Sequence, residues 1–157
     1  MSARGSAPLA ATPETLRRFD RSLPMNLLRA REAVMRTFTP ALKAHGLTPQ
    51  QWRVLRVLVE YGQLSISELA AQTFLLAPSL SRILQNLEQR GIVKRHSVAG
   101  DQRRAAISVS ARGRRLFDKI APLSEARYRH IAEQFGPGKL ELLYELLDEL
   151  VDRLSED

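Results

Sequence analysis

The chain has 157 residues, a formal net charge of +7 and no cysteine. Its composition, 44% hydrophobic and 26% charged residues, is typical of a globular protein, and the length favours one domain. The lack of cysteine excludes a disulfide framework, a thiolate zinc site, a cysteine nucleophile and a thiol redox sensor. The three histidines, His45, His96 and His130, are too widely spaced for a metal site, so we expect no metal and no cofactor.

The N-terminal segment is rich in serine, alanine, glycine and proline, which predicts a disordered arm over residues 1–20. Its weakly apolar patch at residues 7–11 is too short for the core of a secretory signal. No apolar run reaches the roughly 18 residues of a membrane-spanning helix. We therefore expect a cytoplasmic protein.

The positive charge is concentrated in one part of the chain. From Lys94 to Arg115 there are seven basic residues and one acid, Asp101, whereas residues 139–157 contain seven acids and two bases. Charge segregated in this way indicates a face that binds a polyanion such as a nucleic acid. The alternative is a basic loop that is merely exposed to solvent.

The first helix is predicted from about Pro24 to His45. Proline suits the first helical position, and Gly46 suits the residue that follows a helix end. Arg31 and His45 interrupt the apolar stripe of this helix, so Arg31 is expected on a buried face. The stripe consists of Leu27, Val34, Met35, Phe38 and Leu42.

Two short helices and a tight turn follow. Capping boxes at Thr48-x-x-Gln51 and Ser65-x-x-Glu68 predict the starts of two helices. After the turn "FLLA", a helix from Pro78 to Arg90 has leucines and an isoleucine on one side and polar, largely uncharged residues on the other. This pattern predicts a helix-turn-helix.

A β-hairpin is predicted next, with arms "IVKRHSV" and "RAAISVS" joined through residues 99–102. Apolar Ala105, Ile107 and Val109 alternate with the intervening residues at the period of two expected of a strand. Because an isolated hairpin is marginal in water, we expect it to pack on the helices, with Leu64–Ser65 as a third short strand. This order of elements is that of a winged helix.

Two long helices complete the chain, at about residues 111–134 and 139–154, and the fold class is mainly α with a small β-hairpin. The last helix has a leucine stripe at coiled-coil spacing. This stripe and the first helix are expected to supply a dimer interface, the alternative being packing within one chain. The leucines are Leu140, Leu143, Leu147, Leu150 and Leu154.

The chain resembles the MarR family of transcriptional regulators. The segments that carry the resemblance are "LTPQQWRVLRVL", "SISELA", "APSLSRILQNLEQRGIVKR", "GDQRRAAISVSARG" and the leucine-rich C-terminal helix. Within the family, "LLRAREAVMRTFTPALKAHGLTPQQWR" is most similar to repressors of aromatic-acid catabolism, of the homoprotocatechuate-operon and nicotinate-degradation type. The resemblance implies one domain over residues 21–157, with a winged helix-turn-helix at about 48–110 and dimerisation helices at about 23–45 and 111–155.

The resemblance also implies an obligate homodimer that binds a pseudo-palindromic operator in double-stranded DNA. The recognition helix is then Pro78–Arg90, and its polar residue types suit contacts to base edges and phosphates. Its candidate residues are Ser79, Ser81, Arg82, Gln85 and Asn86. The expected phosphate contacts are Lys94, Arg95, Arg104, Arg112 and Arg114.

Two residues at the hairpin tip have separate expected roles. Arg103 is expected to reach into the flanking minor groove, where a narrow, electronegative channel favours arginine. Asp101 would weaken binding to a polyanion unless it is paired, so we expect it to orient Arg103. The alternative is that Asp101 is a simple turn residue.

Without cysteine, the signal that releases the DNA is expected to be a ligand, and the resemblance points to a small aromatic carboxylate as effector. An unpaired arginine on a buried stripe is costly, so a carboxylate ligand would suit Arg31. The alternative is pairing with Glu32 or another acid. His45, Trp52 and Arg53 are candidates to complete the ligand site, although Trp52 also suits the core.

These observations predict a sequence-specific, ligand-responsive dimeric repressor that does not bind membranes. A constitutive architectural DNA-binding protein of low specificity is the alternative. An enzyme is not expected, because the sequence has no glycine-rich phosphate loop, metal cluster or nucleophile–base pair.

Overall fold

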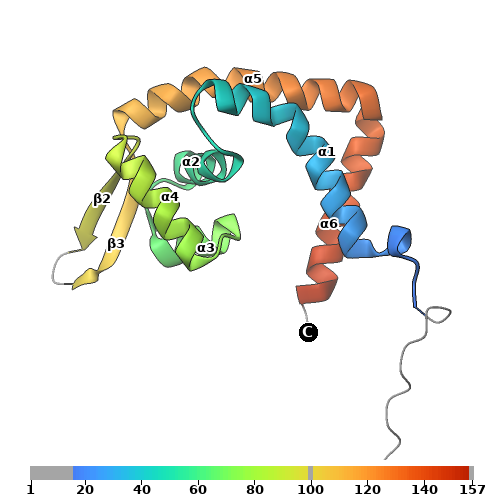
Figure 1. Ribbon diagram of the computed structural model, residues 1–157, viewed down its shortest axis with the longest axis horizontal. Helices are drawn as coiled ribbons and strands as arrows, with labels where there is room; N and C mark the ends of the chain where they lie inside the picture. Colours follow the sequence, from blue (N-terminus) through green and yellow to red (C-terminus); the bar gives the residue numbers. More distant parts are fainter. Residues whose placement is uncertain (1–15, 99–100, 156–157) are drawn as a thin grey trace, which may run out of the picture. The chain divides into compact units, whose positions relative to one another are not determined.

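The computed structural model describes residues 16–98 and 101–155, with the backbone alone at residues 98 and 101–104 (Figure 1). Internal contacts divide the chain into residues 1–34 and 35–157, and each unit is described by itself. The first unit contains a short 3-10 helix, η1 (Phe19–Arg21), and the start of α1 (Leu23–Ala44). The 3-10 helix begins inside the segment predicted to be a disordered arm; residues 1–15 lie outside the described part.

Both predicted capping boxes are present. The hydroxyl of Thr48 accepts from the backbone N–H of Gln51 (3.1 Å) at the start of α2 (Pro49–Tyr61). The hydroxyl of Ser65 accepts from the backbone N–H of Glu68 (3.1 Å), whose carboxylate accepts in return from the Ser65 N–H (2.7 Å), at the start of α3 (Ile66–Thr73). These reciprocal bonds satisfy backbone donors that a helix start leaves open.

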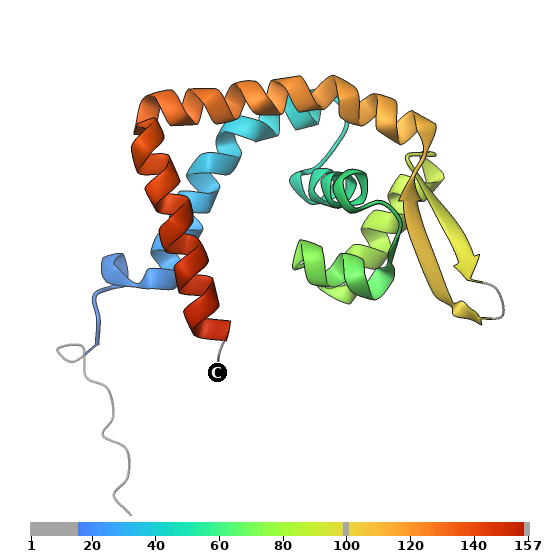
Figure 2. The same cartoon turned by 180° about the vertical axis from the view of Figure 1, so that it is seen from behind.

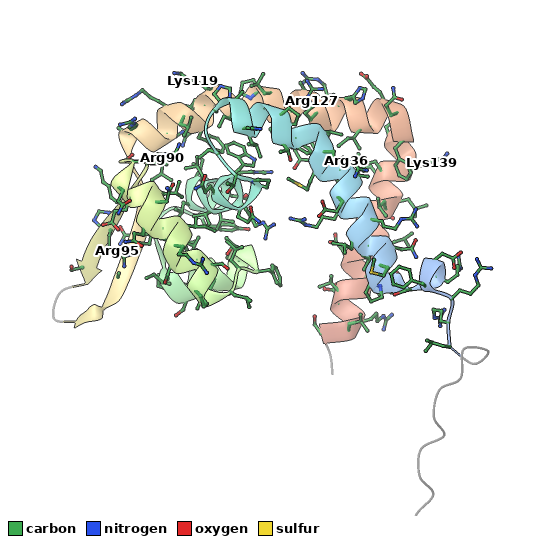
Figure 3. The ribbon with its side chains drawn as sticks, in the orientation of Figure 1. Arg36, Arg90, Arg95, Lys119, Arg127 and Lys139 are labelled. Atoms are coloured by element: carbon green, nitrogen blue, oxygen red, sulfur yellow. The ribbon has the colours of Figure 1, made fainter. Side chains whose placement is uncertain are left out.

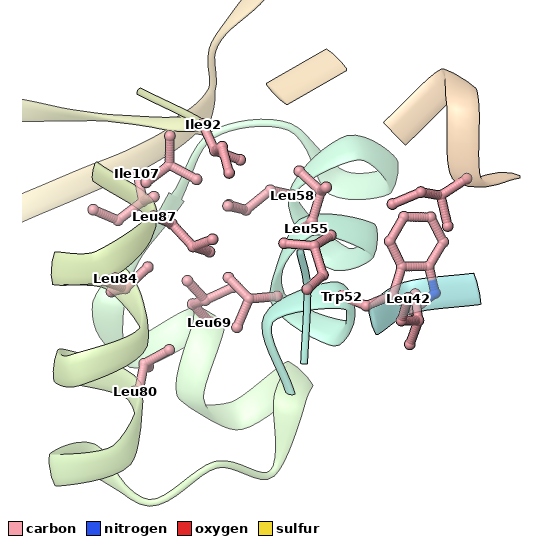
Figure 4. Close-up of a cluster of buried hydrophobic side chains, with 14 residues drawn as sticks. Leu42, Trp52, Leu55, Leu58, Leu69, Leu80, Leu84, Leu87, Ile92 and Ile107 are labelled. Carbon is pink, nitrogen blue, oxygen red and sulfur yellow. The ribbon is translucent and has the colours of Figure 1, made fainter. Parts of the chain in front are cut away.

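The core of the second unit lies between α2, α3, α4 (Ala77–Gln89) and the sheet (Figure 4). Buried residues recur at helical spacing on α2 and α4, and α3 buries Leu69 and Thr73, so each helix buries one face against the others. Burial of these side chains is the main source of stability for this unit. Fully buried members include Leu55, Leu58, Leu69, Leu80, Leu84, Leu87 and Ile107.

The three strands form an antiparallel sheet in the order β1-β3-β2, which confirms the predicted third strand. They are β1 (Leu64–Ser65), β2 (Val93–Val98) and β3 (Asp101–Val109). The expected alternation along β3 is wrong at Ala106, which is as buried as an apolar core residue. Ala106 lies opposite Ser65 of β1 on one side and His96 of β2 on the other, so a strand flanks it on each side.

The hairpin is joined tightly to α5 (Ala111–Phe135). Ser110 caps this helix by accepting from the N–H of Gly113 (2.9 Å), and its hydroxyl donates to the carbonyl of Gly91 (2.6 Å). A Cβ at Gly113 would clash with the carbonyl oxygen of Ile92, so glycine permits the close approach. The start of α5 is therefore held against the turn between α4 and β2.

The last helix, α6 (Pro137–Ser155), follows α5 after Gly136 (Figure 2). All 19 of its residues belong to the described part of the chain, and none of them is buried. The helices begin and end within two residues of the predicted positions, the usual uncertainty of helix ends. The predicted fold class, mainly α with a small β-hairpin, is confirmed.

Candidate DNA-binding surface

Helix α4 has one buried and one exposed face. Leu80, Leu84 and Leu87 are at most 1% exposed, and they fix the orientation of the helix in the second unit. The α4 residues predicted to contact DNA all lie on the exposed side of this helix. They are Ser79, Ser81, Arg82, Gln85 and Asn86. The buried leucines thus present polar side chains to solvent from a rigid helix.

A hydrogen-bond chain links α2 to this exposed face. The side-chain amide of Gln51 donates to the side-chain carbonyl of Asn86 (3.0 Å), and Arg90 donates to the same oxygen (3.4 Å). The other end of the Gln51 side chain accepts from the backbone N–H of Thr48 (3.0 Å). Gln51, the glutamine of the α2 capping box, therefore orients Asn86, a predicted DNA contact on α4. The capping motif alone did not indicate this role.

A hollow of about 390 Å³ lies between the start of α2 and α4. Its walls include Thr48 and Gln50 from α2 and its cap, and Ser79 and Arg82 from α4. The sequence pattern predicted this polar surface on α4 alone. The structure extends it to the start of α2, because the helix-turn-helix brings that end beside α4.

The turn before α4 exposes two large apolar side chains. Phe74 is 90% exposed and Leu76 is 77% exposed. Phe74 has a φ of 55°, a left-handed conformation that is uncommon for a bulky residue. Apolar side chains beside a polar reading helix suit contacts to thymine methyl groups.

The predicted phosphate contacts differ in their surroundings. Lys94 is exposed on β2. Arg95, labelled in Figure 3, forms an ion pair with Glu88 of α4 (3.2 Å). Arg114 pairs with Asp118 (3.2 Å) and lies over the Phe117 ring. Carboxylates already partly neutralise the charges of these two arginines. The charge of Lys94 is therefore more accessible to a phosphate.

The hairpin tip contains three of the predicted residues, Asp101, Arg103 and Arg104. Their backbone belongs to β3, which agrees with the predicted wing. Their side chains lie outside the described residues, and so does the expected pairing of Asp101 with Arg103. The roles of these three residues stay predictions.

The expected burial of Arg31 is wrong for the first unit. Its side chain is 46% exposed and pairs with Glu32 (3.1 Å). The adjacent stripe residues Leu27 and Val34 are also exposed, at 41% and 40%. The alternative raised from the sequence, a pairing with Glu32, is present.

Each of the other three predicted ligand residues contacts another part of the protein. Trp52 is buried and stacks on Phe117 with ring centroids 5.2 Å apart. Arg53 donates to the backbone carbonyl of Thr73 (3.0 Å). The ring of His45 bonds to the carbonyl of Ala41 (2.9 Å), so each of the three has a structural partner.

A different arginine lies beside aromatic rings. Arg56 on α2 donates to the hydroxyl of Tyr128 on α5 (3.3 Å), and the Tyr128 ring lies 4.9 Å from that of Phe38. On α6, burial raises the pKa of the Tyr144 phenol, with smaller contributions in the same direction from Tyr128 and Glu141. In the sequence, Arg56 could have been found as a candidate ligand residue because it follows Trp52 by one helical turn.

Across the described residues, no three His, Cys, Asp or Glu side chains form a group suited to a metal ion. Within the same residues, no helix is both long and apolar enough to cross a bilayer. The arrangement of a reading helix, a wing and basic side chains is chemically suited to duplex DNA.

Comparisons with known proteins agree with this geometry. Residues 45–104 match the model of the MarR family. The regulator FarR of Neisseria gonorrhoeae is 41% identical over 82% of this chain and 88% of its own. The homoprotocatechuate degradative operon repressor of Escherichia coli is 40% identical over 83% of this chain and 88% of its own.

Solved structures give the same match. The crystal structure of NadR in complex with 4-hydroxyphenylacetate is 40% identical, with a TM-score of 0.73, covering 86% of this chain and 96% of NadR. These similarities extend well beyond the helix-turn-helix, into the helices at both ends. The predicted resemblance is confirmed, and the matching curated proteins are named as transcriptional regulators, not enzymes.

Proposed function

Because the chain belongs to the MarR family of transcriptional regulators, we propose that it is a homodimeric repressor whose operator complex is released by a small aromatic carboxylate. The observation that carries this proposal is the difference between the two faces of α4. Its leucines are fully buried, and its opposite face presents polar side chains that suit base edges.

The DNA-binding part of the proposal assigns different tasks to different side chains. Ser79, Ser81, Arg82, Gln85 and Asn86 read the major groove, while Arg103 enters the flanking minor groove. Lys94 and its basic neighbours contact phosphates and contribute affinity with little sequence preference. The phosphate set includes Arg95, Arg104, Arg112 and Arg114.

Exposed apolar side chains support dimerisation. On α6, Leu142, Leu146 and Val151 are 53%, 55% and 61% exposed. In the first unit, Phe19 is 72% exposed and Leu23 is 52% exposed. Large apolar patches of this kind are uncommon on monomers and are typical of protein interfaces, so we infer that a second copy covers both sets.

The effector part of the proposal rests on Arg56. A guanidinium next to aromatic rings suits an aromatic acid, because arginine binds carboxylates in a bidentate manner and the rings offer stacking surfaces. NadR, solved with 4-hydroxyphenylacetate, makes this ligand the first compound to test. Arg31, in the other unit, remains a second predicted partner for the carboxylate.

The test begins with a DNA fragment that the protein selects from a random pool. Binding to this fragment should exceed binding to random DNA by about 10³-fold or more at physiological salt. Arg103→Ala should strongly weaken binding to the selected fragment while leaving the dimer intact. Equal affinity for both DNAs would instead support a low-specificity architectural protein.

The effector is tested by titrating 4-hydroxyphenylacetate and related aromatic acids against the selected complex. Release by one of them should be lost in Arg56→Gln, with Arg129→Gln on α5 as a charge-matched control. Loss in Arg31→Gln alone would move the carboxylate partner to the first unit. If no aromatic acid releases the DNA, the effector part of the proposal is wrong.

A further inference from the structure

A group of cationic side chains lies where the end of α4 meets the first turns of α5, apart from the residues proposed to read the major groove. A hollow of about 520 Å³ is lined by Arg90, Arg112, Arg115 and Lys119, together with His45 and the apolar side chains of Ile92 and Leu116. Arg90 and Lys119, labelled in Figure 3, come from the end of α4 and from α5. The volume falls in the range of small-molecule pockets.

The charge in this hollow is uncompensated. No acidic side chain is among its described lining residues. Among the residues whose side chains the structure describes, 16–97 and 105–155, none of its four cations forms an ion pair. Three of the cations, Arg112, Arg115 and Lys119, repeat at three- and four-residue spacing on α5, so they repel one another on one helix face.

The walls of the hollow are held in place by other interactions. Ser110 donates to the carbonyl of Gly91, and Gly113 packs on the carbonyl of Ile92, which fixes the start of α5 against the end of α4. Arg90 is anchored through its bond to Asn86 (3.4 Å). The cations are therefore presented by a preorganised frame, which lowers the cost of ordering a ligand.

From this geometry we propose that the hollow binds a small ligand carrying two or more phosphoryl groups. Four cations without an acid exceed what a single carboxylate needs, and guanidinium groups match phosphate oxygens in a bidentate manner. Ile92 and Leu116 add an apolar wall for the uncharged part of such a ligand. The site is separate from Arg56, so it does not depend on the proposed aromatic effector.

The occupied site would join both ends of the hairpin. Ile92 precedes β2, and Arg112 follows β3, while Arg90 is the C-cap of α4. A phosphate-bearing ligand held by these residues would stiffen the base of the wing relative to α4. It is therefore placed to modulate DNA binding as a second input.

The test uses the full-length protein without DNA and titrates inorganic tripolyphosphate by calorimetry at physiological salt. Wild type should bind one tripolyphosphate per chain. The double variant Arg115→Gln, Lys119→Gln should bind at least about tenfold more weakly, because each lost charge-assisted contact contributes on that order. Neither residue is among the proposed DNA contacts, and both side chains are exposed.

The matched control is Arg127→Gln, Arg129→Gln, which removes the same charge from exposed positions further along α5. It should bind within about twofold of wild type, since the Debye length of about 8 Å screens distant charges. Equal losses in the two double variants would overturn the proposal in favour of general charge attraction. A nucleoside triphosphate that binds more tightly than tripolyphosphate would assign the apolar wall to a base.

One further result would also overturn the proposal. If Arg115→Gln, Lys119→Gln leaves tripolyphosphate binding unchanged but weakens binding to every DNA duplex, the hollow is a contact for the DNA backbone. Failure of aromatic acids to release the operator would leave the calorimetric result unaffected. The two proposals therefore fail independently.

Discussion

Helices α4 and α6 both have leucines at helical spacing, but they use them differently. On α4, Leu80, Leu84 and Leu87 are at most 1% exposed. On α6 no residue is buried, and Leu146 is 55% exposed. The winged helix covers the apolar face of α4 within one chain, which leaves the polar face for DNA. The apolar face of α6 stays exposed in the single chain.

The comparison shows that periodicity identifies an apolar face but not what covers it. Both stripes predicted a helix with a buried side. Only the contacts within the second unit show that the α4 stripe is satisfied by α2, α3 and the sheet. The largest expected effects of substitution follow from this difference.

The largest effect is expected from placing charges on α6. Leu143→Glu, Leu146→Glu should convert the dimer to a monomer and lower operator affinity by about 10²–10⁴-fold, because two linked reading helices bind with a high effective concentration. Sedimentation equilibrium measures the mass, and Glu145→Gln on the same helix is the control. A stable dimer in the double variant would mean that α6 is not the interface.

The corresponding change on α4 should act within one chain. Leu84→Ala should lower the free energy of unfolding by about 3 kcal/mol, because it leaves a cavity in a packed core. In the monomeric Leu143→Glu, Leu146→Glu background, Leu154→Ala, at a side chain that is 66% exposed in the single chain, should change it by less than about 0.5 kcal/mol. Urea unfolding measures both; a similar loss at the two positions would remove the distinction between the helices.

The polar face of α4 should control sequence preference. Gln85→Ala should weaken the free energy of binding to the preferred sequence by about 1–3 kcal/mol and relax specificity at one base pair. Lys94→Ala should weaken binding equally across sequences and reduce the salt slope by about 1. Gel-shift titrations at several salt concentrations separate the two, and a uniform effect of Gln85→Ala would place it among the phosphate contacts.

The smallest effect is expected from the chain that links α2 to α4. Gln51→Ala and Asn86→Ala should be coupled by about 0.5–1.5 kcal/mol in operator binding, because Gln51 orients the Asn86 amide. A double-mutant cycle measures this coupling. Additive effects would show that Asn86 reads DNA without help from the cap of α2.

The local structure was largely predictable, since its signals lie close together in sequence. Capping boxes at Thr48 and Ser65 and the third strand at Leu64–Ser65 all occur as predicted. Caps and strand alternation depend on residues a few positions apart. Such signals do not require knowledge of the tertiary contacts.

The candidate site was less predictable, because its members come from distant parts of the chain. The pair Arg56 and Tyr128 is 72 residues apart, and the hollow at Arg115 combines ends of three helices. Arg31 was expected to be buried because it interrupts an apolar stripe, but that stripe is exposed on one side in the single chain. Helical periodicity cannot distinguish a core face from an interface.

The most direct test of the proposed repressor is selection of DNA from a random pool, followed by measurement of the number of chains per duplex. A dimer with paired α4 helices predicts an enriched pseudo-palindrome whose half-sites are about one helical turn apart, bound by two chains. An enriched site without two-fold symmetry, bound by one chain, would contradict the dimeric reading mechanism. Absence of any enriched sequence would contradict sequence-specific binding altogether.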